Sequence, residues 1–321
     1  MLTATYNEKD CLAYFEKRHI KYAFHDIDGT HSLIRNWPPV MSIVLYDVIV
    51  NGLPEDFDSP ENEQRLIAEA GQRPLPETDS FCVDSAGLSA LTQMEWAIRR
   101  AVEEGTVDIV CDHAVNSEKV RLIRAGQERF PDMPDTPETD EMLRVCTPRL
   151  FKLYERVLNG YCRDKNLEEA KTFPEKYRVK GSFEFLRFLK DNGVKNYFVT
   201  GAVVEKGMGM HEEVVTLGYR TGEGELVDDI IGSTWDEKLP KDEIMRELMG
   251  KLGAKGDEIL ITGDGRSEVS AGAGMGAFII SRLPENAATQ RKLHRALGTH
   301  MIVADYFDPA LGRVLKAEKE S

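Results

Sequence analysis

Two aspartates one residue apart, Asp26 and Asp28, have the types and spacing that point most directly to chemistry. They end an apolar run that begins at Tyr22 and has the character of a β-strand, and Gly29 follows them, where the chain can turn sharply. Because side chains two residues apart in a strand point to the same face, both carboxylates are expected to project together. Carboxylates so close repel each other unless a cation or hydrogen-bond donors neutralise them. The pair is therefore typical of a metal-assisted nucleophile with an acid/base group beside it.

The region from Lys180 onward has the pattern that can position such a pair. Strands are expected there at 196–200, 229–232, 258–263, 277–280 and 301–304, with helices at 182–191, 203–217 and 241–252. Strands separated by helices imply a parallel sheet covered on both faces, in which ligands bind beyond the carboxyl ends of the strands. Thr200 and Asp264 stand at two of these ends. They are expected to converge with the aspartate pair on one crevice.

The chain between residues 30 and 180 has a different pattern. Apolar residues recur at helical spacing in 38–48, 88–104 and 150–158, and no run of alternating strands is evident. Proline-rich stretches at 54–60, 74–78 and 131–140 are expected to be turns or connectors, and a short helix is expected at 10–19. The sequence thus predicts an α/β fold. Residues 1–33 and 180–321 are expected to form a doubly wound, Rossmann-like parallel sheet core, and residues 34–179 are expected to form a large, mainly α-helical inserted domain.

The composition limits the classes of function. With 321 residues, 41% of them hydrophobic, the chain can bury a sizeable core, and its length suggests about two domains. A net charge of −14 argues against a nucleic-acid or membrane partner. Five widely spaced cysteines without a CxxC pair favour thiols over disulfides or a zinc site. No stretch has the pattern of a signal peptide or a membrane span, so a cytoplasmic protein is expected. Nothing in the sequence indicates an oligomeric state.

Four ordered segments carry a resemblance to a known family. His25-Asp-Ile-Asp-Gly-Thr30, Val199-Thr-Gly201, a lysine near 240 and Gly263-Asp-Gly-Arg-Ser-Glu268 resemble the four motifs of the haloacid dehalogenase superfamily. The match covers about the first thirty residues and most of the chain from Lys180. The helical block between the first two motifs then resembles the family's cap domain at its first insertion point. The resemblance implies the phosphatase branch, because the family's dehalogenases lack the second aspartate of the first motif.

The resemblance also implies a role for the residues of the first two motifs. Asp26 would attack phosphorus and form an aspartyl-phosphate. Asp28 would protonate the leaving alkoxide and then deprotonate the water that releases phosphate. Thr200 and Gly201, with backbone N–H groups at an expected helix start, would hold the phosphoryl oxygens.

The third motif leaves two candidate lysines, Lys238 and Lys241, to neutralise the charge on Asp26 and the transferred group. Lys241 is favoured because it stands at the start of an expected helix. Arg35, shortly after the first motif, either clamps a substrate anion or makes a surface ion pair. His25 and His31 flank the first motif and are expected to be hydrogen-bonded neighbours rather than ligands.

The fourth motif implies a magnesium site. Asp264 would bind Mg²⁺ together with Asp26 and the backbone carbonyl of Asp28, and Glu268 would hold the metal's waters. The family usually has Asp where this chain has Glu268, so whether Glu268 touches the metal stays open. A hard cation also offsets the repulsion between the carboxylates.

The expected function is hydrolysis of a small phosphorylated metabolite, a sugar or polyol phosphate first, because a cap over a closed crevice excludes water and large polymers. Two alternatives stay open. A phosphomutase-like phosphotransferase would pass the phosphoryl group to a sugar with the same residues. A non-catalytic sensor of phosphorylated ligands would use the same fold for binding alone.

Overall fold

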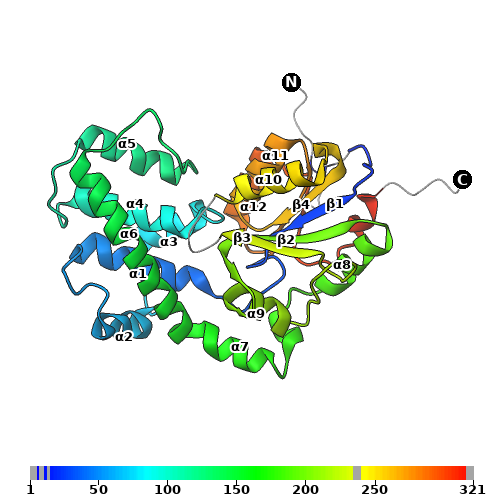
Figure 1. Ribbon diagram of the computed structural model, residues 1–321, viewed down its shortest axis with the longest axis horizontal. Coiled ribbons are helices and arrows are strands. Elements are labelled where there is room, and N and C mark those ends of the chain that lie inside the picture. The colour runs from blue at the N-terminus through cyan, green and yellow to red at the C-terminus, as the bar shows by residue number, and fades with distance from the viewer. Residues whose placement is uncertain (1–5, 7–10, 13–14, 234–239, 316–321) are drawn as a thin grey trace, which may run out of the picture. The chain divides into compact units, whose positions relative to one another are not determined.

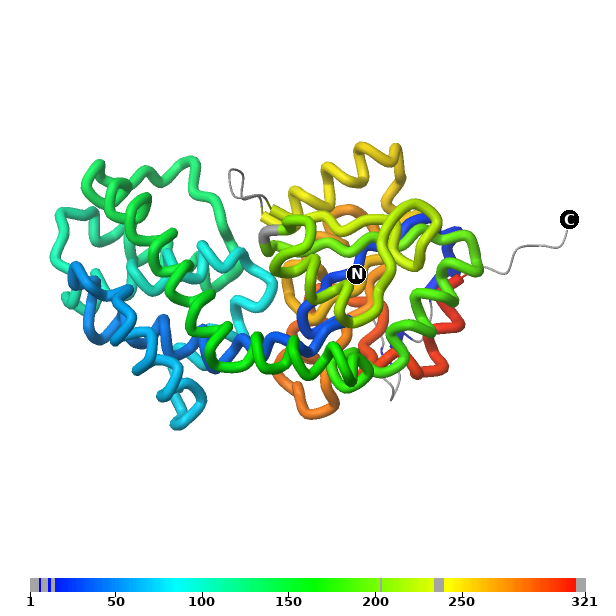
Figure 2. Tube along the Cα trace, turned by 60° about the horizontal axis from the view of Figure 1, so that its bottom comes forward, coloured from blue at the N-terminus to red at the C-terminus, as the bar shows by residue number. Residues whose placement is uncertain are grey.

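The structure is a computed structural model that describes residues 6, 11–12, 15–233 and 240–315. It divides into two compact units, Met1–Ile34 with Glu169–Ser321, called the core unit here, and Arg35–Glu168, called the cap unit. The trace in Figure 2 follows the chain from β1 through the cyan and green helices of the cap unit and back into the core unit. The expected functional domains, 1–33 with 180–321 and 34–179, stay a prediction, because compactness alone does not show that either unit folds or works by itself.

The core unit is built on one six-stranded sheet. Every strand runs parallel to its neighbours, and the order across the sheet is β3-β2-β1-β4-β5-β6. This order reverses direction between β1 and β4, the kind of switch point at which doubly wound folds bind ligands. The strands are β1 Tyr22–His25, β2 Lys195–Glu205, β3 Asp229–Ser233, β4 Ile259–Gly263, β5 Phe278–Arg282 and β6 Met301–Val303. The predicted doubly wound parallel sheet is confirmed.

Helices cover both faces of this sheet (Figure 1). On one face Phe24 and Ile261 of the strands pack with Met245 of α10 and Ala271 of α11. On the other face Ala23, Leu260 and Phe278 pack with Phe185 and Leu189 of α8. Neighbouring strand residues thus belong to opposite cores, as the two-residue period of a strand requires. The helices of the core unit are α8 Ser182–Asp191, α9 Gly209–Thr216, α10 Lys241–Leu252, α11 Arg266–Met275 and α12 Ala288–Leu297, with short 3₁₀ turns at Pro174–Tyr177, Gly256–Glu258 and Pro309–Arg313.

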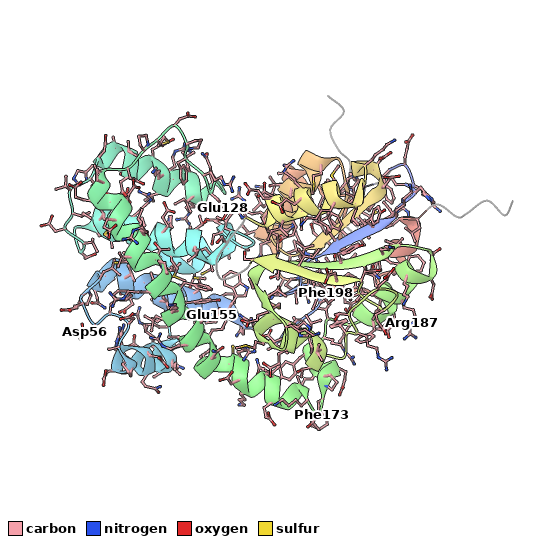
Figure 3. The ribbon with its side chains drawn as sticks, in the orientation of Figure 1. Asp56, Glu128, Glu155, Phe173, Arg187 and Phe198 are labelled. Atoms are coloured by element: carbon pink, nitrogen blue, oxygen red, sulfur yellow. The ribbon has the colours of Figure 1, made fainter. Side chains whose placement is uncertain are left out.

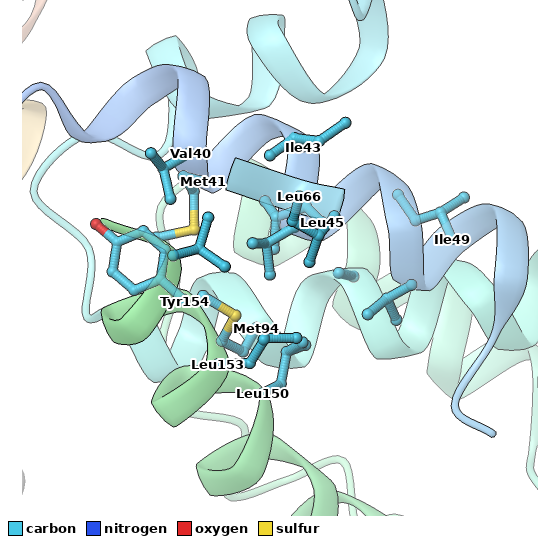
Figure 4. Packing of buried hydrophobic residues seen from close by; sticks show 14 of the residues in the cluster. Val40, Met41, Ile43, Leu45, Ile49, Leu66, Met94, Leu150, Leu153 and Tyr154 are labelled. Atoms are coloured by element: carbon cyan, nitrogen blue, oxygen red, sulfur yellow. The ribbon is translucent and has the colours of Figure 1, made fainter. Parts of the chain in front are cut away.

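The cap unit is helical, and its described residues include no strand. Figure 4 shows its apolar core, where α1 residues such as Met41 and Leu45 pack against Leu66, Met94, Leu153 and Tyr154. The helices are α1 Trp37–Asn51, α2 Pro60–Glu69, α3 Pro76–Asp84, α4 Ala90–Glu104, α5 His113–Arg124, α6 Pro137–Leu158, a π-helical turn Asn159–Arg163 and α7 Asp164–Ala170, which crosses the boundary to the core unit. No helix in the described part of the chain combines the length and the apolar character that crossing a bilayer requires.

The three proline-rich stretches are turns or connectors only in part. Residues 54–59, 74–75 and 131–136 are not helical, as expected, but Pro60, Pro76 and Pro137, which were expected to mark turns or connectors, each open a helix. The reason is that proline lacks only an N–H that has no partner in the first turn of a helix, and its fixed φ suits that position. The helix expected at 10–19 falls partly outside the described residues, and residues 15–19 are not helical.

The strand that carries Thr200 also differs from the expectation. Residues 196–200 were expected to end at a helix start near Val203, but β2 continues to Glu205, and α9 begins only at Gly209. The pairing of β2 with β3 shifts between Val199 and Val203 and then resumes. Gly232 permits this close approach, because a Cβ there would lie 2.5 Å from the carbonyl oxygen of Ala202. The longer strand is therefore a consequence of pairing with β3, which local helical periodicity does not report.

Candidate functional site

Asp26 follows β1 in the middle of the sheet and is 5% exposed. Its backbone N–H donates to the carbonyl of Thr262 on β4 at 2.9 Å, which holds the residue at the carboxyl end of the sheet. Lys241, the first residue of α10, donates through Nζ to Asp26 Oδ1 and, at 2.5 Å, to Glu268 Oε1 on α11. Thr30 donates through Oγ1 to Asp26 Oδ2 at 3.2 Å. One buried lysine thus joins two buried carboxylates that come from separate elements.

Burial and charge set the protonation of this group. Burial raises the pKa of Asp26, and the charge of Lys241 opposes that change. Burial alone would lower the pKa of Lys241, but Asp26 and Glu268 outweigh it, so the pKa is raised and the amine stays charged. Burial would raise the pKa of Glu268, yet Lys241 outweighs that effect and lowers it. The charged amine of Lys241 is therefore what permits the carboxylates of Asp26 and Glu268 to share an environment without water.

Asp264 follows β4, the strand beside β1. Its carboxylate lies against Gly29, where an added Cβ would come 2.0 Å from Asp264 Oδ2. Gly29 has a φ of 71°, which only glycine adopts without strain, and its N–H donates to the carbonyl of Ser32 at 2.9 Å. The tight turn after the aspartate pair therefore brings the first and fourth motifs together. Asp28 is half-buried in the same turn, and its backbone forms an isolated β-bridge with that of Ser32.

Thr200 lies on β2, the strand that pairs with β1 on the side opposite to β4. Phe198 of β2, labelled in Figure 3, pairs with His25, so Thr200 is two residues further along β2 and close to the level of Ile27. Thr200 is 4% exposed, and its Oγ1 accepts from the N–H of Ala202 at 3.1 Å. The expectation that Thr200 and Gly201 precede a helix is wrong, because β2 continues through both residues. A phosphate at this point would meet a hydroxyl and an irregular strand instead of a helix N-terminus.

The remaining expected site residues lie elsewhere. Arg35 belongs to the cap unit, where its Nη1 is 3.4 Å from Oε1 of Glu155, which is labelled in Figure 3. Lys238 lies outside the described residues. The structure thus brings together Asp26, Asp264, Glu268 and Lys241, with Asp28 in the same turn and Thr200 on the adjacent strand.

The donor set fits a hard divalent cation in charge and in chemistry. Burial, followed by the charges of Asp26 and Glu268, raises the pKa of Asp264 well above its usual range. The side chains that meet here carry carboxylate oxygen atoms, the kind of ligand that Mg²⁺ prefers. Within the described residues, however, no three carboxylate, imidazole or thiolate side chains gather around one point as a finished metal site. The metal therefore stays a prediction.

Two histidines form a buried hydrogen-bond network beneath the turn. His25 Nδ1 lies 2.7 Å from Thr262 Oγ1, and His31 Nδ1 lies 2.6 Å from Ser182 Oγ. The rings contact each other, with His31 Nε2 at 3.2 Å from His25 Nδ1. Burial lowers the pKa of His25 to about 4, so it is neutral near pH 7. The expectation that these histidines are hydrogen-bonded neighbours is confirmed.

Sequence reasoning missed one residue at this edge of the sheet. Arg282, the last residue of β5, donates through Nη1 to the carbonyl of Gly29 at 2.9 Å. The sequence did contain a signal for Arg282, because Asp264 was chosen as a candidate for the same reason: it is a charged residue at the end of an expected strand. The strand was expected to stop at Ile280, which left Arg282 out.

Comparison with known proteins identifies the fold. No family model matches the sequence, and no curated protein matches it either. Among solved structures, a candidate phosphoglycolate phosphatase from Lactobacillus delbrueckii subsp. bulgaricus is similar with a TM-score of 0.51 and 14% identity over 94% of this chain and all of that one. A protein described as a predicted phosphatase from Clostridium acetobutylicum gives a TM-score of 0.49 at 14% identity, over 92% of this chain and 98% of that one. A haloacid dehalogenase-like family protein from Streptococcus pneumoniae gives 0.40 at 12%, over 90% of this chain and 96% of that one.

Similarity at 14% identity establishes the fold alone, and the two lower TM-scores carry no argument here. The parallel sheet, the helical unit inserted after β1 and the match to a solved structure over almost the whole chain agree with the fold that the resemblance of the four motifs implies. The chain has the doubly wound α/β fold of that solved structure, with a helical unit inserted after the first strand.

Proposed function

We propose that the protein is a Mg²⁺-dependent phosphatase that hydrolyses a small phosphorylated metabolite. The observation that carries the proposal is the buried carboxylate of Asp26, held at the carboxyl end of β1 and in contact with the charged amine of Lys241. A carboxylate becomes a useful nucleophile toward phosphorus when water is excluded and the charge of the phosphoryl group is balanced. Lys241 supplies that balance on the side of α10.

The chemistry divides between the aspartates. Asp26 attacks phosphorus, the bond to the leaving oxygen breaks, and an aspartyl-phosphate forms. Asp28 gives its proton to the leaving alkoxide and then takes one from the water that attacks the phosphoenzyme. Thr200 offers a hydroxyl to the phosphoryl oxygens from the adjacent strand, and Lys241 stabilises the negative charge in both steps.

Asp26, Asp264 and the backbone carbonyl of Asp28 are the groups that would hold Mg²⁺. When bound, the ion offsets the charge of the phosphoryl group and of the carboxylates around it. Glu268 is already engaged by Lys241. Its proposed role is to orient that lysine as well as to meet the waters of the metal.

A panel of phosphorylated metabolites, with sugar and polyol phosphates included, tests the proposal through release of inorganic phosphate with Mg²⁺ or with EDTA. We expect release that needs Mg²⁺ and is abolished in Asp26→Asn, which keeps the shape of the side chain and removes the nucleophile. Equal release by wild type and Asp26→Asn would show that the proposal is wrong. Formation of an isomer without release of phosphate would indicate phosphotransfer instead of hydrolysis.

A further inference from the structure

Arg282 links three segments at the carboxyl edge of the sheet. Its Nη1 donates to the carbonyl of Gly29, in the turn after the aspartate pair, at 2.9 Å. Its Nε donates to the carbonyl of Ala304, directly after β6, at 3.1 Å. The side chain is half-buried, and an arginine that donates to two carbonyls from one planar group is held in a single orientation.

The strand order and register show that the contact from Arg282 to Gly29 crosses the end of β4. Gly263 of β4 pairs with Ser281 of β5, so Arg282 stands level with Asp264 on the neighbouring strand. From there its side chain reaches over the end of β4 to the turn that follows β1, and it ends beside the glycine that Asp264 contacts. Arg282 also places a positive charge near Asp264, which opposes the rise in the pKa of that carboxyl.

We propose that Arg282 is a positioning residue that fixes the turn at Gly29 over Asp264 and thereby sets where Asp28 presents its carboxyl. The inference rests on the proposed function, because it assigns Arg282 to the same site. Backbone hydrogen bonds close the turn on itself: the N–H of Gly29 donates to the carbonyl of Ser32, and the N–H groups of His31 and Ser32 donate to the carbonyl of Ile27. Among the hydrogen bonds described for the turn, the guanidinium of Arg282 is what ties the Gly29 carbonyl to β5 and β6.

Two variants, Arg282→Lys and Arg282→Met, test the proposal. Lysine keeps the charge but can hold only one carbonyl at a time, and methionine keeps bulk without a donor. We expect kcat for para-nitrophenyl phosphate to fall about tenfold in Arg282→Lys and further in Arg282→Met, since small misplacements of a catalytic group are costly. KM should change by less than about threefold, because the lost interaction positions the acid/base and does not bind substrate.

Hydrogen–deuterium exchange supplies a readout that does not depend on activity. Amides of the peptide that spans 26–32 should exchange faster in both variants, and those of α1 in the cap unit should not change. Arg291 gives a matched control, because it also donates to two backbone carbonyls, those of Leu283 and Pro284, just after β5. Arg291→Lys and Arg291→Met should leave kcat and exchange at 26–32 as in wild type.

The outcomes separate the two proposals. If kcat and exchange at 26–32 in Arg282→Met both stay within about twofold of wild type, Arg282 does not position the turn. Full recovery of both in Arg282→Lys would also overturn the proposal, since it would show that the turn does not need a group that holds the carbonyls of Gly29 and Ala304 together. If wild type releases no phosphate from any compound, the phosphatase proposal fails, and the exchange data alone then decide whether Arg282 holds the turn.

Discussion

Lys241 is the residue on which the protonation of the site depends. It is 7% exposed and contacts two carboxylates that are at least as buried, Asp26 at 5% and Glu268 at 1%. Replacing it with methionine would leave like charges together in a dry environment. We expect Lys241→Met to abolish phosphate release and to lower the free energy of unfolding by about 3–5 kcal/mol, as loss of one partner of a buried ion pair does.

Urea denaturation followed by circular dichroism measures this effect, and a second substitution makes it specific. Lys241→Met with Glu268→Gln removes one of the two carboxylates and should recover about half of the lost stability. Lys251, a lysine of the same helix that is 75% exposed and 3.9 Å from Glu247, provides the control. Lys251→Met should change the stability by no more than about 0.5 kcal/mol. Equal effects of the two lysine substitutions would contradict the assignment.

Asp28 gives a prediction about mechanism and not about stability. Its carboxyl is proposed to move protons, whereas only its backbone carbonyl is proposed to meet the metal. We therefore expect Asp28→Asn to lower kcat by roughly 10²- to 10⁴-fold, the usual contribution of general acid–base catalysis. Isothermal titration with Mg²⁺ should give nearly the wild-type affinity. A loss of magnesium binding in this variant would mean that the side chain is a ligand.

At the scale of elements, Thr136, the residue that caps α6 of the cap unit, and Thr147, which lies inside this helix, have opposite expectations. Thr136 caps the helix, accepts from the N–H of Thr139 at 3.3 Å and donates to the carbonyl of Val110 at 2.8 Å. Thr147 is buried, and its Oγ1 has no hydrogen-bond partner among the described residues. We expect Thr136→Ala to destabilise the cap unit by about 1–2 kcal/mol, because it removes a cap. Thr147→Val should be neutral or stabilising, because it removes a polar atom that is not satisfied.

Urea denaturation followed by tryptophan fluorescence measures both changes. Trp96 is 1% exposed and stacks on Phe81 with 3.7 Å between ring centroids, so it contributes a signal for the packing of the cap unit. The two variants act as controls for each other because they lie on one helix. A loss of stability in Thr147→Val equal to that in Thr136→Ala would show that the hydroxyl of Thr147 is satisfied.

The elements also show which features of the fold could be predicted from sequence. The start and end of α10, from Lys241 to Leu252, were predicted correctly, since its apolar period and its closing Gly253 are local signals. The continuation of β2 past Thr200 depends on pairing with β3 around Gly232, a long-range contact that leaves no local signal. The helix starts at Pro60 and Pro76 had a local signal, and the error there was to take proline only as a breaker.

The same distinction applies to the candidate site. Asp26 and Asp264 could be found because each ends or follows a short apolar strand, and the parallel sheet brings such ends together. The contact between Lys241 and Glu268 could not be predicted, because it depends on how α10 packs beside α11. Arg282 reaches Gly29 across an intervening strand, and that geometry appears only once the strand order is known.

At the scale of the whole molecule, two histidines that the fold keeps neutral, the buried His294 and the half-buried His300, make stability depend on pH. His294 is 1% exposed with its Nδ1 at 2.8 Å from Ser281 Oγ, and His300 accepts from the N–H of Ile279 at 3.2 Å. Burial lowers the pKa of each to about 4 from a usual value of 6.5. Between pH 6.5 and 4 the unfolded chain therefore binds protons that the folded chain does not. The stability linked to these residues is complete above pH 6.5 and is lost as the pH falls toward 4.

The contribution of the two histidines has to be measured as a difference between wild type and variants. The reason is that carboxylates with raised pKa values, such as Asp264, change the stability in the opposite direction with pH. Each histidine contributes up to about 1.4 kcal/mol per pH unit inside its window. We expect the free energy of unfolding of wild type to fall more steeply from pH 6.5 to 5 than that of His294→Gln or His300→Gln, with the double variant flattest. Urea denaturation at half-unit steps measures these slopes. Parallel curves for wild type and the double variant would mean that both histidines already titrate in the folded protein near their usual pKa.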